Sequence, residues 1–154
     1  MKPVHAFMEE AIHVAVASAR AGDYAVGAVD VQNQRIIARG QTRLKRENDP
    51  TAHAEIVAIR NACRKLRTRY LDGCVLYSTH EPCPMCASAA VWAKMEGIVF
   101  GAFVKDAEKK ASQRFSWRQM DISCRDVLSK GNPKLKCVGG FERKKCLELF
   151  DLSR

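Results

Sequence analysis

The sequence has no apolar run that approaches the roughly 18 residues a membrane-spanning helix requires. Its first residues carry the acidic pair Glu9 and Glu10, and they lack the charged start, apolar stretch and cleavage site of a secretory signal. Internal repeats and low-complexity segments are also missing. We therefore expect neither a membrane protein nor a repeat array, and we predict a cytoplasmic location.

The cysteine content argues against a disulfide framework. Seven is an odd number, and a chain of 154 residues with 47% hydrophobic residues can build an apolar core without cross-links. The length fits one domain over residues 1–154. Cys83 and Cys86 stand in a metal-ligand pattern, and for the other five cysteines we expect reduced, buried thiols. These are Cys63, Cys74, Cys124, Cys137 and Cys146.

Positive charge is in excess. The chain has 26 Lys and Arg residues against 17 Asp and Glu residues, a net charge of +9. The basic residues gather at 43–46, 64–69 and 105–118, where they could attract phosphates. Because no pattern of aromatic residues for base stacking accompanies them, we favour a solubilising surface and keep polynucleotide binding as the alternative.

The spacing of apolar residues predicts a series of helices and strands. The helices span residues 4–20, about 50–67, 82 onwards and 141–152, and the strands span 26–31, 35–39, 74–79, 97–103 and 135–138. Asp49 and Glu81 are placed to cap the second and third helices. Residues 105–115 lose the pattern and predict a loop or an irregular helix. A hairpin followed by alternating helices and strands indicates an α/β fold with a mixed sheet in three α/β/α layers.

Two short clusters carry the chemistry: His53-Ala54-Glu55 and Pro82-Cys83-Pro84-Met85-Cys86. Each lies where a predicted helix starts after a strand, which is where ligands bind in open α/β sheets. Cys83 and Cys86 are three residues apart, so they share one helix face. The positive potential of a helix N-terminus favours their thiolates.

Two sulfurs and the nitrogen of His53 suit zinc and leave a fourth position for a water, whose pKa zinc lowers towards about 7. Glu55 is then the catalytic group that moves protons between this water and a substrate. The alternative is a closed structural zinc site with Cys137 or Cys146 as its fourth ligand. For His80, as for the other two histidines, we favour a packing or surface role.

The segments Asn48–Glu55 and Glu81–Cys86 match the H-x-E and P-C-x-x-C signature of zinc-dependent nucleobase deaminases. They closely resemble the cytidine and deoxycytidylate deaminase superfamily, most of all the branch that contains bacterial guanine deaminases and tRNA adenosine deaminases. The resemblance runs from the first helix to Phe100-Gly101-Ala102. It implies a cytidine-deaminase-like fold with a five-stranded sheet, one zinc ion per subunit, and a homodimer with active sites near the interface.

The resemblance also implies substrate contacts at Val26, Thr42, Ala54 and Trp92. The segment that continues from Val26 into residues 27–29 approaches the substrate in the family. Thr42 stands where family members commonly carry an asparagine that reads the base, and a hydroxyl offers fewer hydrogen bonds than an amide. Trp92 is similar to a pocket-lining tryptophan of guanine deaminases; the alternative is packing in the core or at a dimer interface.

The region after the fourth strand departs from both kinds of relative. Residues 109–114 lack the Gly- and Ser-containing segment of tRNA deaminases, and Arg114 and Phe115 stand near the place of an acidic residue in guanine deaminases, for which Asp106 is a poor substitute. Phe115 and Trp117 either stack on a base or anchor a loop.

We therefore predict a zinc-dependent hydrolase of purine metabolism that deaminates a free nucleobase or nucleoside, with a guanine-like base favoured. A tRNA adenosine-to-inosine deaminase and a cytosine or cytidine deaminase are the enzymatic alternatives. A zinc-stabilised binding module without catalysis is the alternative from another class.

Overall fold

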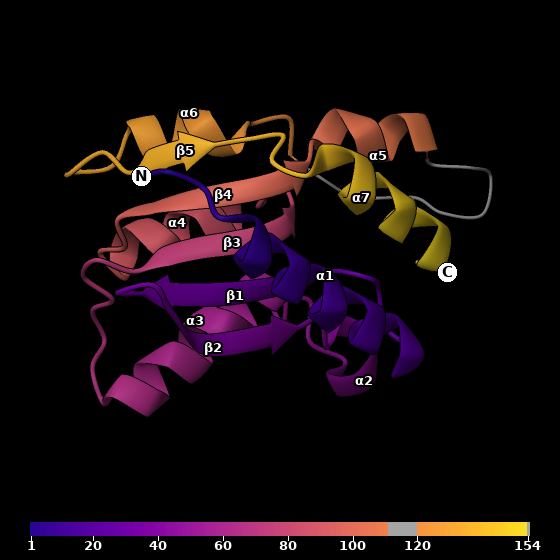
Figure 1. Cartoon of the computed structure of the whole chain (residues 1–154), viewed down its shortest axis with the longest axis horizontal. Helices are drawn as coiled ribbons and strands as arrows, with labels where there is room; N and C mark the ends of the chain where they lie inside the picture. Colours follow the sequence, from indigo (N-terminus) through magenta and orange to yellow (C-terminus); the bar gives the residue numbers. More distant parts are fainter. Residues whose placement is uncertain (111–119, 154) are drawn as a thin grey trace.

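The computed structural model describes residues 1–110 and 120–153, and its centre is a five-stranded sheet in the order β2-β1-β3-β4-β5 (Figure 1). The strands are β1 (Gly27–Gln32), β2 (Arg35–Gln41), β3 (Val75–His80), β4 (Gly97–Ala102) and β5 (Lys136–Val138). β1 pairs antiparallel with β2 and β3, whereas the β3–β4 and β4–β5 pairs are parallel. This arrangement confirms the predicted mixed sheet.

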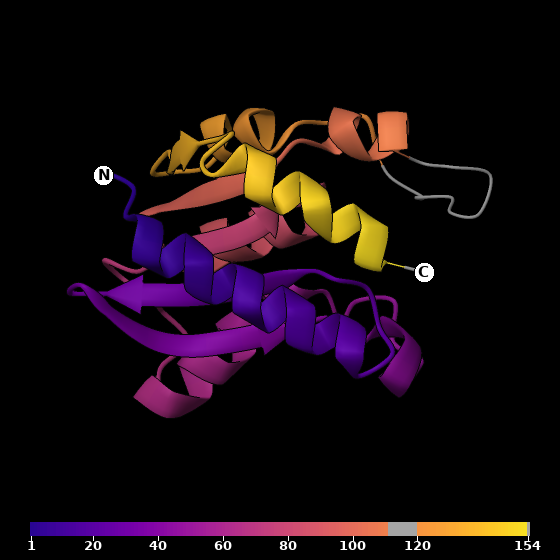
Figure 2. The ribbon, with the colours of Figure 1, turned by 45° about the vertical axis from the view of Figure 1, so that its right-hand side comes forward.

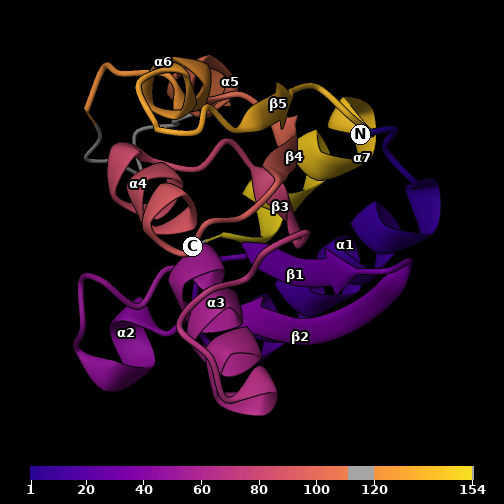
Figure 3. The ribbon, with the colours of Figure 1, turned by 90° about the vertical axis from the view of Figure 1, so that its left-hand side faces the viewer.

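Helices cover both faces of the sheet, as the three-layer prediction requires. α1 (His5–Arg20) and α7 (Arg143–Glu148), which continues into the 3-10 helix Leu149–Leu152, lie side by side on one face (Figure 2). α3 (Ala54–Leu66) and α4 (Pro84–Trp92) cover the opposite face (Figure 3). Each face has its own cluster of buried apolar side chains, so the sheet separates two cores.

The β1–β2 hairpin helps to place α3. Asn33 and Gln34 both have positive φ, which gives the two-residue turn the twist that antiparallel strands need. Gly40 then brings β2 against the first turn of α3, since a Cβ atom there would lie 2.0 Å from the carbonyl oxygen of Ala54. A side chain at this position would push α3 off the sheet, so the glycine fixes where the helix begins.

The predicted start of the second helix is wrong. α3 begins at Ala54 rather than at Pro50, because Asp49 closes a local turn in which its side chain accepts hydrogen bonds from the amide and the hydroxyl of Thr51. A short helix that was not predicted, α2 (Leu44–Glu47), precedes this turn. The predicted cap of the third helix is wrong as well, since α4 begins at Pro84 and Glu81 lies outside it.

The C-terminal third contains more regular structure than the sequence predicted. Within residues 105–115, the part up to residue 110 belongs to a helix, α5 (Val104–Lys110), and residues 111–115 lie outside the described residues. A further helix, α6 (Cys124–Ser129), was not predicted; the Ser123 hydroxyl caps it by accepting from the amide of Asp126. No helix of the described segments is long and apolar enough to span a membrane, and all seven cysteines are free thiols.

Asp30 is an acidic residue in the interior of the sheet. It is fully buried on β1, and neither of its carboxyl oxygens has a hydrogen-bond partner among the residues that the structure describes. Burial alone raises the pKa of Asp30 to about 8, because a charged carboxylate is poorly solvated there. The side chain therefore keeps its proton at neutral pH.

We expect Asp30→Asn to weaken the pH dependence of stability. The folded pKa of about 8 lies above the reference value of 3.8, so the stability that the neutral acid contributes is complete below about pH 4 and is lost as the pH rises towards 8. The difference in unfolding free energy between the variant and the natural protein should therefore grow in favour of the variant over this range, measured by urea denaturation. Asp72→Asn is the control, because it removes an exposed carboxylate instead of a buried one. A pH dependence of the same size in both variants would contradict this explanation.

Candidate active site

α3 and α4 begin at the same edge of the sheet. They follow β2 and β3, which run in the same direction because both are antiparallel to β1. His53 occupies the N-cap position of α3, and Cys83 occupies that of α4. The His53 Nδ1 and Cys83 Sγ atoms are 3.7 Å apart, and so are the Sγ atoms of Cys83 and Cys86. The structure thus brings the three predicted ligands together, with their ligand atoms all within 4.8 Å of one another.

The electrostatics of this cluster favour a cation. The hydrogen bond between Cys83 and Cys86 lowers the pKa of Cys83 to about 4, and the same bond, together with burial, raises the pKa of Cys86. The two sulfurs therefore share one proton at neutral pH, and a divalent cation would displace it. Two thiolate sulfurs and one imidazole nitrogen are a donor set that suits zinc, so the residues present fit a zinc ion.

The alternative of a closed zinc site finds no fourth ligand in residues 1–110 and 120–153. No further His, Cys, Asp or Glu side chain of these residues joins the group formed by His53, Cys83 and Cys86. Cys137 is hydrogen-bonded to Cys124 instead. Cys146 belongs to the apolar core on the other face of the sheet. Three protein donors leave room for a further ligand at a tetrahedral ion.

His80 lies in the interior rather than in the cluster. Its Nδ1 atom is 2.8 Å from the hydroxyl oxygen of Thr79, and its ring packs edge-on against Phe150. Burial lowers the pKa of His80 to about 4, so the imidazole is neutral at physiological pH. These contacts agree with the packing role that we favoured.

Glu55 lies beside the cluster with its carboxyl group buried. Glu55 is only 3% exposed, and this burial raises the pKa of its carboxyl group. The Oε1 atom accepts a 2.9 Å hydrogen bond from the hydroxyl of Ser78, while Oε2 lies 3.6 Å from the sulfur of Cys86. Oε1 is thus held by β3. Oε2 faces the cluster of His53, Cys83 and Cys86, where it can exchange a proton with a molecule bound there.

Ser78 was not among the residues predicted for the site. It is fully buried in β3, where the neighbouring Leu76 and Tyr77 are apolar. A polar side chain that ends a buried apolar run is the signal that could have identified it. Its hydrogen bond to Glu55 makes it a positioning residue for that carboxyl group.

We expect Ser78→Ala to lower kcat about ten-fold, because Glu55 is predicted to move protons and the loss of an orienting hydrogen bond to such a group typically costs about that much. The zinc content should stay unchanged, since Ser78 contacts none of the three ligands directly. Steady-state kinetics and metal analysis of the purified variant test both statements. A variant with the kcat of the natural protein would show that Glu55 needs no support from β3.

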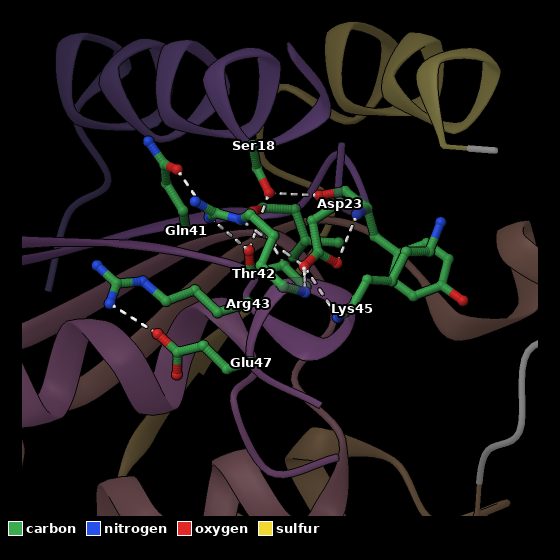
Figure 4. Close-up of polar contacts among 10 residues, drawn as sticks. Ser18, Asp23, Gln41, Thr42, Arg43, Lys45 and Glu47 are labelled. Atoms are coloured by element: carbon green, nitrogen blue, oxygen red, sulfur yellow. Dashed lines mark hydrogen bonds and ion pairs between the residues drawn. The ribbon is translucent and has the colours of Figure 1, made fainter. Parts of the chain in front are cut away.

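Three residues predicted to contact the substrate lie near the start of α3, and all three are buried. Val26 and Ala54 expose little or no surface. The Thr42 hydroxyl donates to the carbonyl oxygen of Val26 at 3.3 Å, and the Thr42 carbonyl accepts from Ser18 and Arg46 (Figure 4). Thr42 therefore uses its hydroxyl to join the residue after β2 to the residue before β1.

Trp92 lies at the end of α4 and is 82% exposed. This exposure rules out the alternative in which the tryptophan packs in the core. The indole lines a groove of about 420 Å³ between α4 and the region of α6, together with Val91, Ile122 and Val127. The pocket and dimer-interface interpretations of Trp92 both remain as predictions.

Asp106, the substitute considered for an acidic residue of guanine deaminases, has structural partners. Its carboxylate accepts two hydrogen bonds from the guanidinium of Arg143, at 2.5 and 3.0 Å, and one from the amide of Phe103. These contacts tie α5 to α7. Arg114, Phe115 and Trp117 lie outside the described residues, so the structure places none of them.

Comparisons with known proteins point to one family. The family described as the cytidine and deoxycytidylate deaminase zinc-binding region matches residues 1–102. Guanine deaminase of Bacillus subtilis is 41% identical over 117 residues, which make up 75% of each chain. A tRNA-specific adenosine deaminase of Aquifex aeolicus is 42% identical over 99 residues, which are 64% of this chain and 66% of that relative. A solved structure from work on A-to-I editing by tRNA:A34 deaminases has a TM-score of 0.77 and 31% identity, and covers 95% of this chain and 99% of that one.

Proposed function

This chain belongs to the cytidine and deoxycytidylate deaminase family, and from that premise we propose that it is a zinc-dependent hydrolase that removes the exocyclic amino group of a free nucleobase or nucleoside as ammonia. A guanine-like purine is the substrate that we favour. The observation that carries the proposal is the buried Glu55 carboxyl group, whose Oε2 atom faces the His53, Cys83 and Cys86 cluster at the strand ends.

His53, Cys83 and Cys86 would hold the zinc ion. When bound, zinc supplies a water of lowered pKa as the nucleophile. Glu55 Oε2 would take one proton of the nucleophilic water and deliver it to the ring nitrogen beside the carbon that carries the amino group, while the water oxygen bonds to that carbon. The same oxygen of Glu55 would then take the second proton and pass it to the amino group as its bond to the carbon breaks, so that one water is consumed and one ammonia is released. Ser78 keeps Oε2 in place by holding Oε1.

One observation supports a small purine substrate: the match to guanine deaminase of Bacillus subtilis extends over 117 residues, against 99 residues for the tRNA deaminase of Aquifex aeolicus. The solved tRNA:A34 deaminase structure, which covers 95% of this chain, favours the second candidate below. Position 42 carries a threonine instead of the asparagine whose amide reads a base in other family members. The Thr42 hydroxyl donates to the carbonyl oxygen of Val26. Recognition of the base must then rest on other groups of the pocket.

A tRNA adenosine deaminase is the second candidate, and a basic surface at the end of α3 favours it. Arg64, Arg67, Arg69 and Lys94 are exposed and form no ion pair with the described residues. The Lys94 ammonium lies 4.0 Å from the centre of the Tyr70 ring, and the Arg69 guanidinium lies 4.9 Å from it. Tyr70 thus contacts two cations at this surface. Such a surface can bind a phosphate backbone.

An ammonia-release assay with the zinc-loaded protein tests the proposal. The panel contains guanine, guanosine, adenine, adenosine, cytosine, cytidine and a tRNA transcript. We expect release from a free purine base or nucleoside. Release from tRNA alone, with binding that weakens steeply as salt rises, would favour the second candidate. No release from any compound would overturn both.

We also propose that the protein forms a homodimer, because Trp92 and Ile122 expose apolar surface at the groove between α4 and α6. The variant Trp92→Arg should then sediment as a monomer at concentrations where the natural protein sediments as a dimer. A natural protein that is monomeric at those concentrations would contradict this part of the proposal.

A further inference from the structure

Glu81 joins the segment after β3 to the end of β4 and to the starts of α5 and α6. Its backbone amide donates to the carbonyl oxygen of Ala102, the last residue of β4, at 2.7 Å. Its Oε2 atom accepts from the amide of Val104 at 3.0 Å, and its Oε1 atom accepts from the amide of Cys124 at 3.0 Å. Val104 and Cys124 are the first residues of α5 and α6. One side chain thus fixes the starts of two helices that are 20 residues apart in the sequence.

The two hydrogen bonds of the Glu81 carboxylate are charge-assisted and therefore strong. A carboxylate that accepts from backbone amides at helix N-termini gains from both the charge-assisted hydrogen bonds and the helix dipoles. Because the two oxygens belong to one carboxylate, the amides of Val104 and Cys124 must stay close together. Both amides are therefore held at one point of the chain, Glu81, which lies two residues before Cys83.

The second helix start also lies close to the candidate active site. The pKa of the Cys124 thiol is raised by its hydrogen bond with Cys137, then by burial, and further by the charges of Cys137, Glu81 and Glu55. The Glu81 carboxylate lies at the start of α6, where it accepts from the amide of Cys124. α6 in turn packs against α4, since Cys124 and Leu128 share an apolar core with Ala87 and Ala90.

We propose that Glu81 is a positioning residue for substrate binding: its carboxylate holds the starts of α5 and α6 against the segment between β3 and α4, two residues before Cys83. This inference rests on the proposed deamination. Glu81 contacts neither the metal ligands nor Glu55 in this role. His53, Glu55 and the cysteines are placed by α3, α4 and Ser78 instead, so the loss of the Glu81 carboxylate should loosen the walls around the metal site and leave the reacting groups in place.

The test is Glu81→Gln, which keeps the shape of the side chain and replaces one acceptor oxygen by a donor that cannot bond to an amide N–H. We expect KM to rise about ten-fold, the size of effect that the loss of one charge-assisted hydrogen bond gives. The kcat value should stay within about two-fold, and the zinc content should not change, because the reacting groups are untouched. Amide hydrogen exchange at Val104 and at Cys124 should become faster together.

Ser123→Ala is the matched control, because it removes the local cap of α6 and leaves Glu81 intact. It should speed exchange at Asp126 without affecting Val104. Should Glu81→Gln fail to fold, Val104→Pro removes one of the two donors from the other side, at a helix position that accepts proline. It should raise KM in the same way.

Unchanged exchange at Val104 and Cys124 in Glu81→Gln would overturn the inference. So would an unchanged KM, or a parallel loss of kcat and zinc, which would place the role of Glu81 in the metal site. The exchange measurement needs no substrate. An inactive natural protein would therefore contradict the proposed function. The exchange rates at Val104 and Cys124 would still show whether Glu81 holds both helix starts.

Discussion

Replacing Glu55 by glutamine is expected to lower kcat about a thousand-fold while the protein keeps its zinc. Glutamine has the size of glutamate and can still accept the hydrogen bond from Ser78 through its oxygen. Its amide nitrogen, however, would take the place of Oε2, the atom that faces the cluster, and an amide cannot take up and return a proton at neutral pH. General acid–base catalysis contributes about 100- to 10,000-fold to a rate, which sets the size of the loss.

Three readouts decide this prediction. Zinc content by elemental analysis should equal that of the natural protein, since none of the three ligands is altered. The control Glu96→Gln, which changes a surface carboxylate paired with Lys136, should keep full activity. An active Glu55→Gln protein would mean that another group moves the protons. A zinc-binding protein with no measurable deamination before or after the change would support the non-catalytic module instead.

Replacing Cys86 by alanine is expected to remove both zinc and activity. The Cys86 sulfur is fully buried and lies 3.7 Å from that of Cys83. Without it the cluster has only two donors, and a catalytic zinc site needs three. Activity should fall to the background of the assay, and added zinc should not restore it. Removal of zinc from the natural protein by a chelator should abolish activity too, but reversibly.

Cys74→Ala is the matched control for this change. Cys74 is as deeply buried as Cys86, and it lies outside the cluster. The loss of a buried sulfur is therefore the same in both variants, and only the loss of a ligand differs. Full zinc content in Cys86→Ala, or equal loss of zinc in the two variants, would show that the cluster is not the metal site.

The sheet and most helices could be predicted from the spacing of apolar residues. In each of these segments the apolar residues recur at the interval that places them on the buried face of a helix or a strand. Two acidic residues show where this reasoning stops. Asp49 and Glu81 look like caps of the helices that follow them, yet Asp49 closes a turn with Thr51, and Glu81 holds the starts of α5 and α6. The partners of a carboxylate depend on which segments meet in space, and local sequence does not contain that information.

The same limit applies to α2 and α6. The carboxylate of Asp23 accepts from the amides of Lys45 and Arg46 in α2, and it comes from the end of α1 (Figure 4). α2 has four residues, and such a short helix depends on contacts of this kind. α6 has six residues and is held at its first residue by Glu81. Neither helix is long enough to show a periodic apolar face.

The candidate site was predictable to a different degree. His53, Glu55, Cys83 and Cys86 follow from the two motifs, because the chemistry of a metal with an adjacent carboxylate needs these residue types at this spacing. Ser78 carries no motif, and its role depends on the pairing of β3 with β1, which brings α3 over that strand. The partner of the Thr42 hydroxyl, and the exposure of Trp92, also depend on packing that the sequence does not show.

X-ray absorption spectroscopy of the zinc-loaded protein tests the central claim most directly. The account predicts two sulfur ligands, one imidazole nitrogen and one oxygen from water at the zinc ion, with the same set in Glu55→Gln. A third sulfur or a second imidazole in place of the water would close the ion off from substrates. That result would contradict the account, because a metal with four protein ligands cannot present a water to a nucleobase.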